Sequence, residues 1–545
     1  MYALVIKDVK VVDGLGNPWF LADVAIQDER IAQIGRIEAA QAEKVIDGKR
    51  MVLAPGFIDM HSHSELIFLN ENQPEFMQGR IRQGITTEIM GNCGISISPV
   101  ADEIKPVMEA SVGWMTPEKL PWEWNSMAEF LELVEKREPI INVGTLTGHG
   151  AIRARVKGFE AGVSSPDEIR QMQAFLRETL EQGSFGLSSG LIYAPGMFAD
   201  TDELIELAKV VAEFDRIYTT HIRGSSETDV DAEQEVIIIG EKAGCRVHRS
   251  HYEAFGKENW HKIEITLKMD EEARKRGVDM AFDMFPYTAA MTMMIAIYPP
   301  WALDGGWSKF VQRVQDPDTR KRIENDIMHV VPSWPTWLPG SWPHNLVKAA
   351  GWENIYIGYI PSDKNKDFEG LNLRELGEKL GKPPFEAITD LLVEEKGAIS
   401  QLIFGVSGDR QNEEPIKAIV KHPLGGYATD AIDIGRGTPH PAAYGTYPRI
   451  LGHYVRELKL LSLEDAIRRM TSFPANRLGI KDRGIIREGC FADLVLFDPD
   501  KVIDRATYED PRQFAEGIHY VIVNGQVLVE NGSLKAIRPG RVLKK

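Results

Sequence analysis

Six side chains that can bind a metal ion follow directly on short apolar runs of this sequence. They are His61, His63, Cys93, His221, His251 and Asp430. Neutral imidazoles and a thiolate are borderline-soft donors, which Zn²⁺ accepts at about 2.0 to 2.3 Å. Alternate residues of a strand point to the same face, so His61 and His63 can face one ion. The residue types therefore predict a zinc site.

Each of these residues taken alone also has an ordinary structural explanation. Two histidines at the end of a strand can form hydrogen bonds within a loop, and a lone buried cysteine is often an inert core residue. It is the recurrence of such residues at successive strand ends that favours a metal site over these explanations.

The elements that would position these residues alternate between short apolar runs and helical stretches. The runs are 56–60, 86–91, 140–146, 183–187, 217–221, 246–251, 279–285 and 425–429. This βαβα order predicts an α/β fold, a TIM-like (β/α)8 barrel, in which the carboxyl ends of the strands meet at the active-site rim. We place the barrel at residues 55–479. An insertion rich in Trp and Pro at about 289–345 is expected to form a substrate lid or a subunit interface.

The two ends of the chain have a different pattern of apolar and polar residues. Residues 1–54 and 480–545 contain alternating apolar and polar runs broken by turn residues, such as Asn524-Gly525. This pattern is typical of antiparallel strands joined by tight turns. Neither end holds enough strands for its own core, so we expect both to build one small β-sandwich domain.

Composition narrows the classes of partner. The 545 residues carry a net charge of −17, which argues against a nucleic acid or an anionic membrane as partner. No apolar run is long enough for a transmembrane helix. Three cysteines, an odd number, cannot form a disulfide framework. We expect a soluble cytoplasmic protein that acts on a small-molecule amide and can form a homo-oligomer.

The sequence resembles the N-acyl-D-amino-acid deacylases (D-aminoacylases) of the amidohydrolase superfamily. The segments that carry the resemblance are APGFIDMHSHSE (54–65), GITTEIMGNCGISISP (84–99), GHGAIR (148–153), FGLSSGLIYAPG (185–196), THIR (220–223), DMFPYTA (283–289), ATD (428–430) and GCFADLVLFDP (489–499). GNCG is the most specific, because many relatives in the superfamily use a carboxylated lysine as metal bridge where this subgroup uses a cysteine.

The resemblance implies a zinc site made by Cys93, His221 and His251. It also implies a second, weaker position offered by His61, His63, Cys93 and Asp430. Three protein ligands with an open fourth position are what a catalytic zinc requires. Asp430 is the expected general base, which would take a proton from the attacking water and pass it to the leaving nitrogen. Tyr193 and Tyr287 are expected to bind substrate.

The sequence departs from the family where the substrate carboxylate is bound. Family members hold it with a lysine shortly after the sixth-strand histidine and an arginine after the eighth strand. Here Tyr252-Glu253 follows His251, and His440-Pro441-Ala442-Ala443 stands in the second stretch. Losing two charge-assisted bonds predicts a substrate without that carboxylate, and Glu253 would repel one. Arg436 or Arg449 could instead supply a cation from a shifted loop.

Several residues keep two interpretations. His149 either lines the pocket or forms a structural hydrogen bond, and Arg223 either orients a carboxylate or ligand or forms a surface ion pair. We expect His248 to serve packing, and Cys245 and Cys490 to be buried small side chains.

Two classes compete with the deacylase interpretation. One is a different zinc enzyme of the same fold, namely a hydantoinase-like or dihydroorotase-like cyclic amidase; a nucleobase deaminase fits less well, because a cysteine metal ligand on the second strand is not its pattern. The other is a non-catalytic barrel relative. Such a relative would usually have lost ligands, whereas all six are present here.

Overall fold

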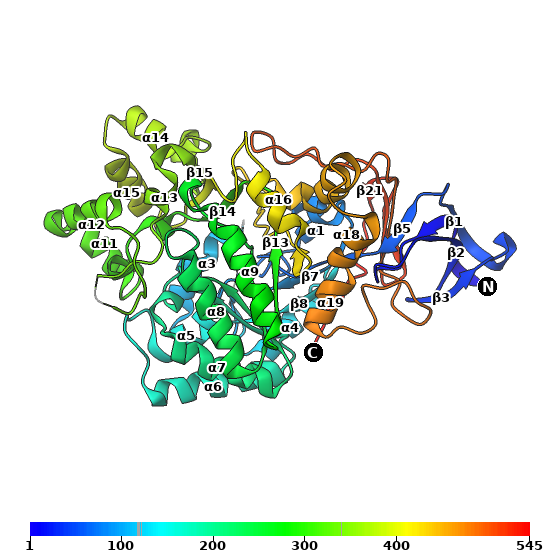
Figure 1. Cartoon of the computed structure of the whole chain (residues 1–545), viewed down its shortest axis with the longest axis horizontal. Coiled ribbons are helices and arrows are strands. Elements are labelled where there is room, and N and C mark those ends of the chain that lie inside the picture. The colour runs from blue at the N-terminus through cyan, green and yellow to red at the C-terminus, as the bar shows by residue number, and fades with distance from the viewer. Residues whose placement is uncertain (117–119, 121, 339) are drawn as a thin grey trace.

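The computed structural model describes residues 1–116, 120, 122–338 and 340–545. Figure 1 shows the N-terminal strands at one end of the long axis and a group of helices at the other, with the parallel strands between them. That group includes α11 (Trp307–Gln315), α12 (Pro317–His329), α14 (Leu373–Leu380) and α15 (Pro384–Glu394). Within the described residues, none of the helices has both the length and the apolar character needed to cross a bilayer.

The parallel strands pair in chain order. One sheet contains β6 (Phe57–Asp59), β7 (Ile85–Met90) and β8 (Asn142–Thr145). A second contains β9 (Thr147–Gly148), β10 (Gly186–Gly190), β11 (Ile217–His221), β12 (Arg246–Arg249), β13 (Met280–Met284) and β17 (Gly425–Tyr427). Only Leu146 separates β8 from β9, and a parallel bridge joins Ser62 to Ala431, beyond the ends of β6 and β17. If β8 and β9 are counted as one interrupted strand, the two sheets together contain eight parallel strands in chain order, as the sequence predicts.

The fourth strand is displaced from its predicted position. We expected it at 183–187, but β10 spans Gly186–Gly190. Gly183 has φ of +116°, a conformation that glycine adopts readily, and Ser184 donates its N–H to the carbonyl of Thr179. These residues end the preceding helix, so the strand starts later.

Helices follow the parallel strands at the positions where the sequence becomes amphipathic. α6 (Pro166–Glu181) begins at a capping box in which Ser165 accepts from the Glu168 N–H and Glu168 accepts from the Ser165 N–H. α8 (Asp229–Ala243) ends at Gly244, which is left-handed. α5 (His149–Lys157), α7 (Thr201–Glu213) and α9 (Lys262–Lys275) complete this layer, which Figure 1 shows along one side of the strands.

A buried ionic group ties α5 to α7. Glu203 accepts a hydrogen bond from His149 Nε2 at 2.8 Å and forms an ion pair with Arg153, and the three residues are fully buried. Burial raises the pKa of Glu203, but His149 and Arg153 outweigh this effect and lower it to about 2. Of the two interpretations of His149, the structure therefore shows the structural hydrogen bond.

Replacing this carboxylate is expected to change how stability depends on pH. Because the pKa of Glu203 is lower in the folded state, its contribution of about 3 kcal/mol is present above pH 5 and declines as the pH falls towards 2. We therefore predict that Glu203→Gln is less stable than the wild type at pH 7 and that the difference shrinks by more than half at pH 3. Urea unfolding at both pH values measures it, and an equal difference at both would contradict the assignment.

The two chain ends share one mixed sheet. Most neighbouring strands in it are antiparallel, as the sequence predicts, but the first strand pairs in parallel with the fourth and the fifth. The N-terminal segment contributes β1 (Tyr2–Val11), β2 (Phe20–Gln27), β3 (Arg30–Gly35), β4 (Ala42–Asp47) and β5 (Val52–Pro55), and the C-terminal segment contributes β18 (Leu494–Phe497), β19 (Ile518–Val523), β20 (Gln526–Glu530) and β21 (Ser533–Leu534). β5 pairs with β18, which joins the segments, and apolar side chains of both form one core. Asn524-Gly525 makes the predicted hairpin turn between β19 and β20. The sandwich arrangement itself stays a prediction.

The segment between β13 and β17 forms a unit of its own. β14 (Ala289–Met293) and β15 (Ile355–Tyr359) flank β16 (Ser400–Phe404) in an antiparallel sheet, and helices including α10 (Pro300–Leu303) and α13 (Leu346–Ala350) lie between these strands along the chain. Phe310, Ile323, Leu376 and Leu391 share its core. Since β14 pairs with β16, the unit extends past the Trp- and Pro-rich stretch to Phe404.

Candidate metal centre

The six predicted donors lie at the carboxyl ends of parallel strands. His61 and His63 follow β6, Cys93 follows β7, His221 ends β11, His251 follows β12 and Asp430 follows β17. Carboxyl ends of neighbouring parallel strands meet at one edge, where active sites of α/β folds are built. The structure accordingly brings all six donors together.

Cys93 takes part in two groups of donors. In the first, the ligand atoms of Cys93, His221 and His251 lie within 4.8 Å of one another. Cys93 Sγ is 3.5 Å from His251 Nε2, and the rings of His221 and His251 are 4.3 Å apart. Donors on one tetrahedral zinc are separated by about 3.3 to 3.8 Å. The three residues therefore fit one ion with a fourth position open.

The second group holds His61, His63, Cys93 and Asp430, again with ligand atoms within 4.8 Å. Asp430 Oδ1 is 3.2 Å from His61 Nε2 and 3.3 Å from His63 Nε2, and Cys93 Sγ is 3.3 Å from His61 Nε2. This donor set can hold a second ion. Its sulfur is shared with the first group, so the two positions are adjacent.

The Gly91–Gly94 loop fixes the position of Cys93. Gly91, Cys93 and Gly94 have φ of +79°, +53° and +68°, and for the cysteine this left-handed conformation is a strained one. A Cβ on Gly94 would lie 2.6 Å from the Gly190 nitrogen, and one on Gly190 would lie 1.9 Å from the Cys93 carbonyl oxygen. Only glycine allows this approach of the loop to β10, which explains the GNCG motif.

Asp283, at the end of β13, orients the histidines. Its carboxylate lies 3.2 Å from His61 Nδ1 and 3.0 Å from His248 Nε2, and it accepts the backbone N–H of His251 at 2.6 Å. A carboxylate only accepts, so His61 carries its proton on Nδ1 and turns Nε2 toward Cys93 and Asp430. His248 therefore supports the centre through Asp283, in addition to the packing expected from the sequence.

Cys93 and His221 have the ionisation that metal ligation requires. For His61, His63 and His251, burial lowers the pKa, but surrounding anionic groups outweigh burial and raise the pKa. Burial raises the pKa of Cys93, but His61 and His251 outweigh this effect and hold it well below its ordinary value. Burial and the charge of His251 lower the pKa of His221 to about 4, so its imidazole is neutral at pH 7. For His251, burial lowers the pKa, whereas Glu253 and Cys93 raise it, to about 9. A bound cation supplies the positive charge that a proton on His251 otherwise provides.

A cavity of about 560 Å³ opens on the donors, and we call it the polar cavity. Tyr193 and Glu253 line it together with His63, Cys93, His221, His251 and Asp430. Tyr193 follows β10, and its hydroxyl is 2.7 Å from Thr292 Oγ1. Glu253 is buried, and Ser225 Oγ donates to its Oε1 at 3.3 Å.

Two predicted substrate-binding residues lie away from this cavity. Arg223 is buried and donates from Nε and Nη2 to Glu235, each at 3.0 Å. Its guanidinium lies over the ring of Trp337. The ion pair considered as its alternative role is thus present, but it is buried instead of lying on the surface. Tyr287 is buried beside His440, with its hydroxyl 3.5 Å from Asp504. Neither side chain lines the polar cavity.

Three residues at the centre, Asp283, Thr292 and His344, have no role that was predicted from the sequence. Asp283 stands within DMFPYTA at the end of the seventh strand run, a signal that could have identified it. Thr292 and His344 line the polar cavity from the unit between β13 and β17. Their approach depends on how that unit folds over the strands, which no local pattern indicates.

The fold and this donor set define a metal-dependent hydrolase of the amidohydrolase class. The model of the amidohydrolase family matches residues 44–323 and 368–529. The N-acyl-D-glutamate deacylase of Alcaligenes xylosoxydans xylosoxydans is 33% identical to this chain over 542 residues, covering 99% of this chain and 96% of that protein. The chain therefore belongs to the N-acyl-D-amino-acid deacylase family of the amidohydrolases.

Solved structures give the same relationship. The crystal structure of the N-acyl-D-glutamate deacylase from Bordetella bronchiseptica, complexed with zinc and a phosphonate mimic of the tetrahedral intermediate, matches with a TM-score of 0.81 at 30% identity. A D-aminoacylase described as having a binuclear metal centre, with activation by one metal and attenuation by the second, matches with a TM-score of 0.80 at 30% identity. Both matches cover 100% of each chain.

Removing the shared sulfur is expected to affect metal content more than removing a donor of one group. We predict that Cys93→Ala loses bound zinc, because both donor groups contain this thiol, whereas His63→Ala keeps about one zinc per chain on Cys93, His221 and His251. Elemental analysis after dialysis measures the zinc content.

The matched control for that experiment is Cys245→Ala, because Cys245 is also a buried thiol but precedes β12 at the opposite end of the strand. Zinc retained in folded Cys93→Ala at the level of the control would contradict the assignment.

Proposed function

We propose that the protein is a zinc-dependent amidohydrolase that hydrolyses the amide bond of a small N-acyl compound lacking a free carboxylate. The family membership and the donor groups support the reaction. The observation that carries the substrate class is the lining of the polar cavity. Among the described lining residues there is a buried carboxylate, Glu253, and there is neither lysine nor arginine.

Zinc fits the first donor group, because a thiolate and two imidazoles match its preference and leave one position for substrate or water. Bound there, it would supply a water with a pKa near 7 and polarise the amide carbonyl. His61, His63 and Asp430 offer a second position beside Cys93.

Asp430 is the proposed general base and acid. Burial raises its pKa, but His61 and His63 hold it well below the ordinary value, so the carboxylate is ionised and ready to accept a proton. The Asp430 side chain is 14% exposed and is more accessible than the side chains of His61 and His63, with which it pairs. It also lines the polar cavity. It would accept the proton of the attacking water and deliver it to the leaving nitrogen.

Tyr193 is the proposed hydrogen-bond donor to the substrate. It faces the donors, with its ring 5.1 Å from the ring of His221. Burial and the charge of Cys93 raise the pKa of its hydroxyl well above the ordinary value, so the hydroxyl keeps its proton at neutral pH. A neutral phenol can donate to a carbonyl oxygen as negative charge develops on it.

The sequence offers two arginines, Arg449 and Arg436, as replacements for the family cations. Arg449 pairs with Glu413 and Asp504 and donates to the carbonyl of Pro286. Arg436 is exposed. Neither lines the polar cavity. A substrate carboxylate placed there would meet Glu253, and no lysine or arginine among the described lining residues would pair with it. Burying it there would cost binding energy.

The competing classes are less well supported. Three deacylases match 99 to 100% of this chain at 30 to 33% identity, which favours a linear N-acyl compound over the ring of a cyclic amidase. A non-catalytic relative would not need six metal donors arranged around one cavity.

Hydrolysis of paired substrates tests this proposal. We predict that the wild type cleaves N-acetyl-D-amino acid carboxamides with a kcat/KM at least about tenfold higher than the corresponding free acids, because burying an unpaired carboxylate costs more than about 1.4 kcal/mol. Burial raises the pKa of Glu253 to about 7, so its charge is fully present only at higher pH. At pH 8, Glu253→Gln is expected to reduce this preference, since the repelling charge is removed while size is kept. A preference of the wild type for free acids would refute the substrate class.

Glu258→Gln is the matched control for Glu253→Gln, because Glu258 lies on the same connecting segment but is exposed. It should keep the wild-type preference. No hydrolysis of either substrate by zinc-loaded enzyme would count against the reaction, and a preference unchanged in Glu253→Gln would count against the role of Glu253 alone.

The Ser62–Ala431 bridge supports closure of the eight parallel strands into a (β/α)8 barrel. The other features stay predictions from the sequence. They are the domain boundaries between residues 54 and 55 and between residues 479 and 480, the β-sandwich, a homo-oligomer and a cytoplasmic location.

A further inference from the structure

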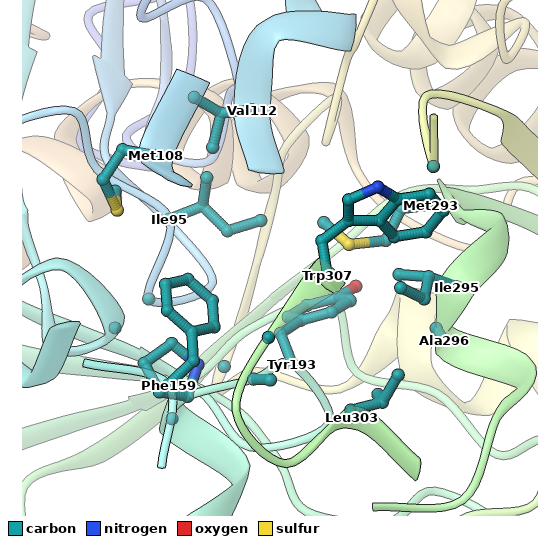
Figure 2. Close-up of a pocket in the computed structure, with 18 of the residues that line it drawn as sticks. Ile95, Met108, Val112, Phe159, Tyr193, Met293, Ile295, Ala296, Leu303 and Trp307 are labelled. Atoms are coloured by element: carbon teal, nitrogen blue, oxygen red, sulfur yellow. The ribbon is translucent and has the colours of Figure 1, made fainter. Parts of the chain in front are cut away.

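A second cavity lies beside the polar cavity and is lined almost entirely by hydrocarbon. It spans about 1020 Å³, including space that is open to solvent, and we call it the apolar cavity. Figure 2 shows Ile95, Met108, Val112, Phe159, Leu303 and Trp307 around its space. Among its described lining residues Lys396 is the only lysine, arginine or carboxylate, and its side chain is exposed.

The two cavities meet at the metal centre. Cys93, Ile95, Trp114, Ile192 and Tyr193 line both of them. A substrate whose carbonyl carbon lies beside Cys93 and Tyr193 therefore has two directions in which its remaining parts can extend.

The positions of two carboxylates decide which part extends in which direction. Asp430 and Glu253 line the polar cavity and do not line the apolar one. If Asp430 protonates the leaving nitrogen, that nitrogen must lie in the polar cavity. The acyl group, on the other side of the carbonyl carbon, then extends into the apolar cavity.

We infer that the apolar cavity binds the acyl chain and that this enzyme prefers long hydrocarbon acyl groups. The inference rests on the proposed amidohydrolase function. A single acetyl methyl beside Cys93 would leave most of the apolar side chains that line this cavity without contacts. A chain of eight or more carbons would instead bury its methylenes against Val112, Phe159 and Trp307.

The side chains labelled around the apolar cavity come from distant parts of the chain. Met108 and Val112 lie on α3 (Lys105–Val112), Phe159 follows α5, and Leu303 and Trp307 belong to the unit between β13 and β17. The Trp-rich segment, which the sequence analysis interpreted as a lid or an interface, thus supplies part of the acyl-binding wall.

The test is a series of acyl lengths on one amine. With the zinc-loaded full-length enzyme and N-acyl-D-alaninamides, each methylene from acetyl to octanoyl should raise kcat/KM, up to about fourfold per group, and by at least about 100-fold in total. Equal or faster cleavage of the acetyl compound would overturn the inference and leave the proposed function standing.

A variant that fills the cavity gives a second, independent readout. Val112→Phe should lower the octanoyl-to-acetyl ratio of kcat/KM by at least about tenfold, because the added ring occupies the path of the chain. Val163→Phe makes the same substitution at a position that is 48% exposed and should keep the wild-type ratio. An unchanged ratio in folded Val112→Phe would contradict the assignment.

Binding keeps the inference testable without turnover. If no acyl compound is hydrolysed, the proposed function fails, and calorimetric titration with octanamide and acetamide tests the cavity directly. At least about 100-fold tighter binding of octanamide by the wild type, weakened in Val112→Phe, supports the cavity assignment. Equal affinity for the two amides overturns it.

Discussion

The position of one sulfur atom governs the site. Cys93 Sγ lies 3.3 Å from His61 Nε2 and 3.5 Å from His251 Nε2, so the thiolate stands between histidines that follow two non-adjacent strands, β6 and β12. Its left-handed backbone is maintained by the close approach of Gly94 and Gly190. The strain is localised at the reacting centre, where strained conformations recur in enzymes. The adjacency of the two donor groups follows from this single placement.

The two cavities extend this arrangement from chemistry to specificity. Glu253, two residues after His251, lines the polar cavity, whereas the cavity on the other side of Tyr193 is lined mainly by apolar side chains. A carbonyl held beside Cys93 therefore has a polar environment on one side and an apolar one on the other. This asymmetry is the basis of the proposed substrate, an N-acyl compound with a hydrocarbon acyl chain and no free carboxylate.

Much of this could be predicted from the sequence, because the signals are local. His61, Cys93 and Asp430 follow apolar runs, and consecutive parallel strands bring their ends together. The roles of Asp283 and His344 were missed for different reasons. Asp283 carries a local signal at a strand end, whereas His344 reaches the cavity only through the fold of the segment after β13. Arg223 and Tyr287 have residue types suited to substrate binding, but partners distant in the sequence, Thr336 and Asp504, lie beside them outside the polar cavity.

The central claim is that Cys93 binds zinc together with histidines. X-ray absorption at the zinc edge of the purified full-length protein tests it most directly, because sulfur and nitrogen neighbours differ in distance and scattering strength. The account predicts one sulfur at about 2.3 Å with nitrogen or oxygen neighbours at about 2.0 to 2.2 Å. A zinc spectrum explained by nitrogen and oxygen alone would contradict it.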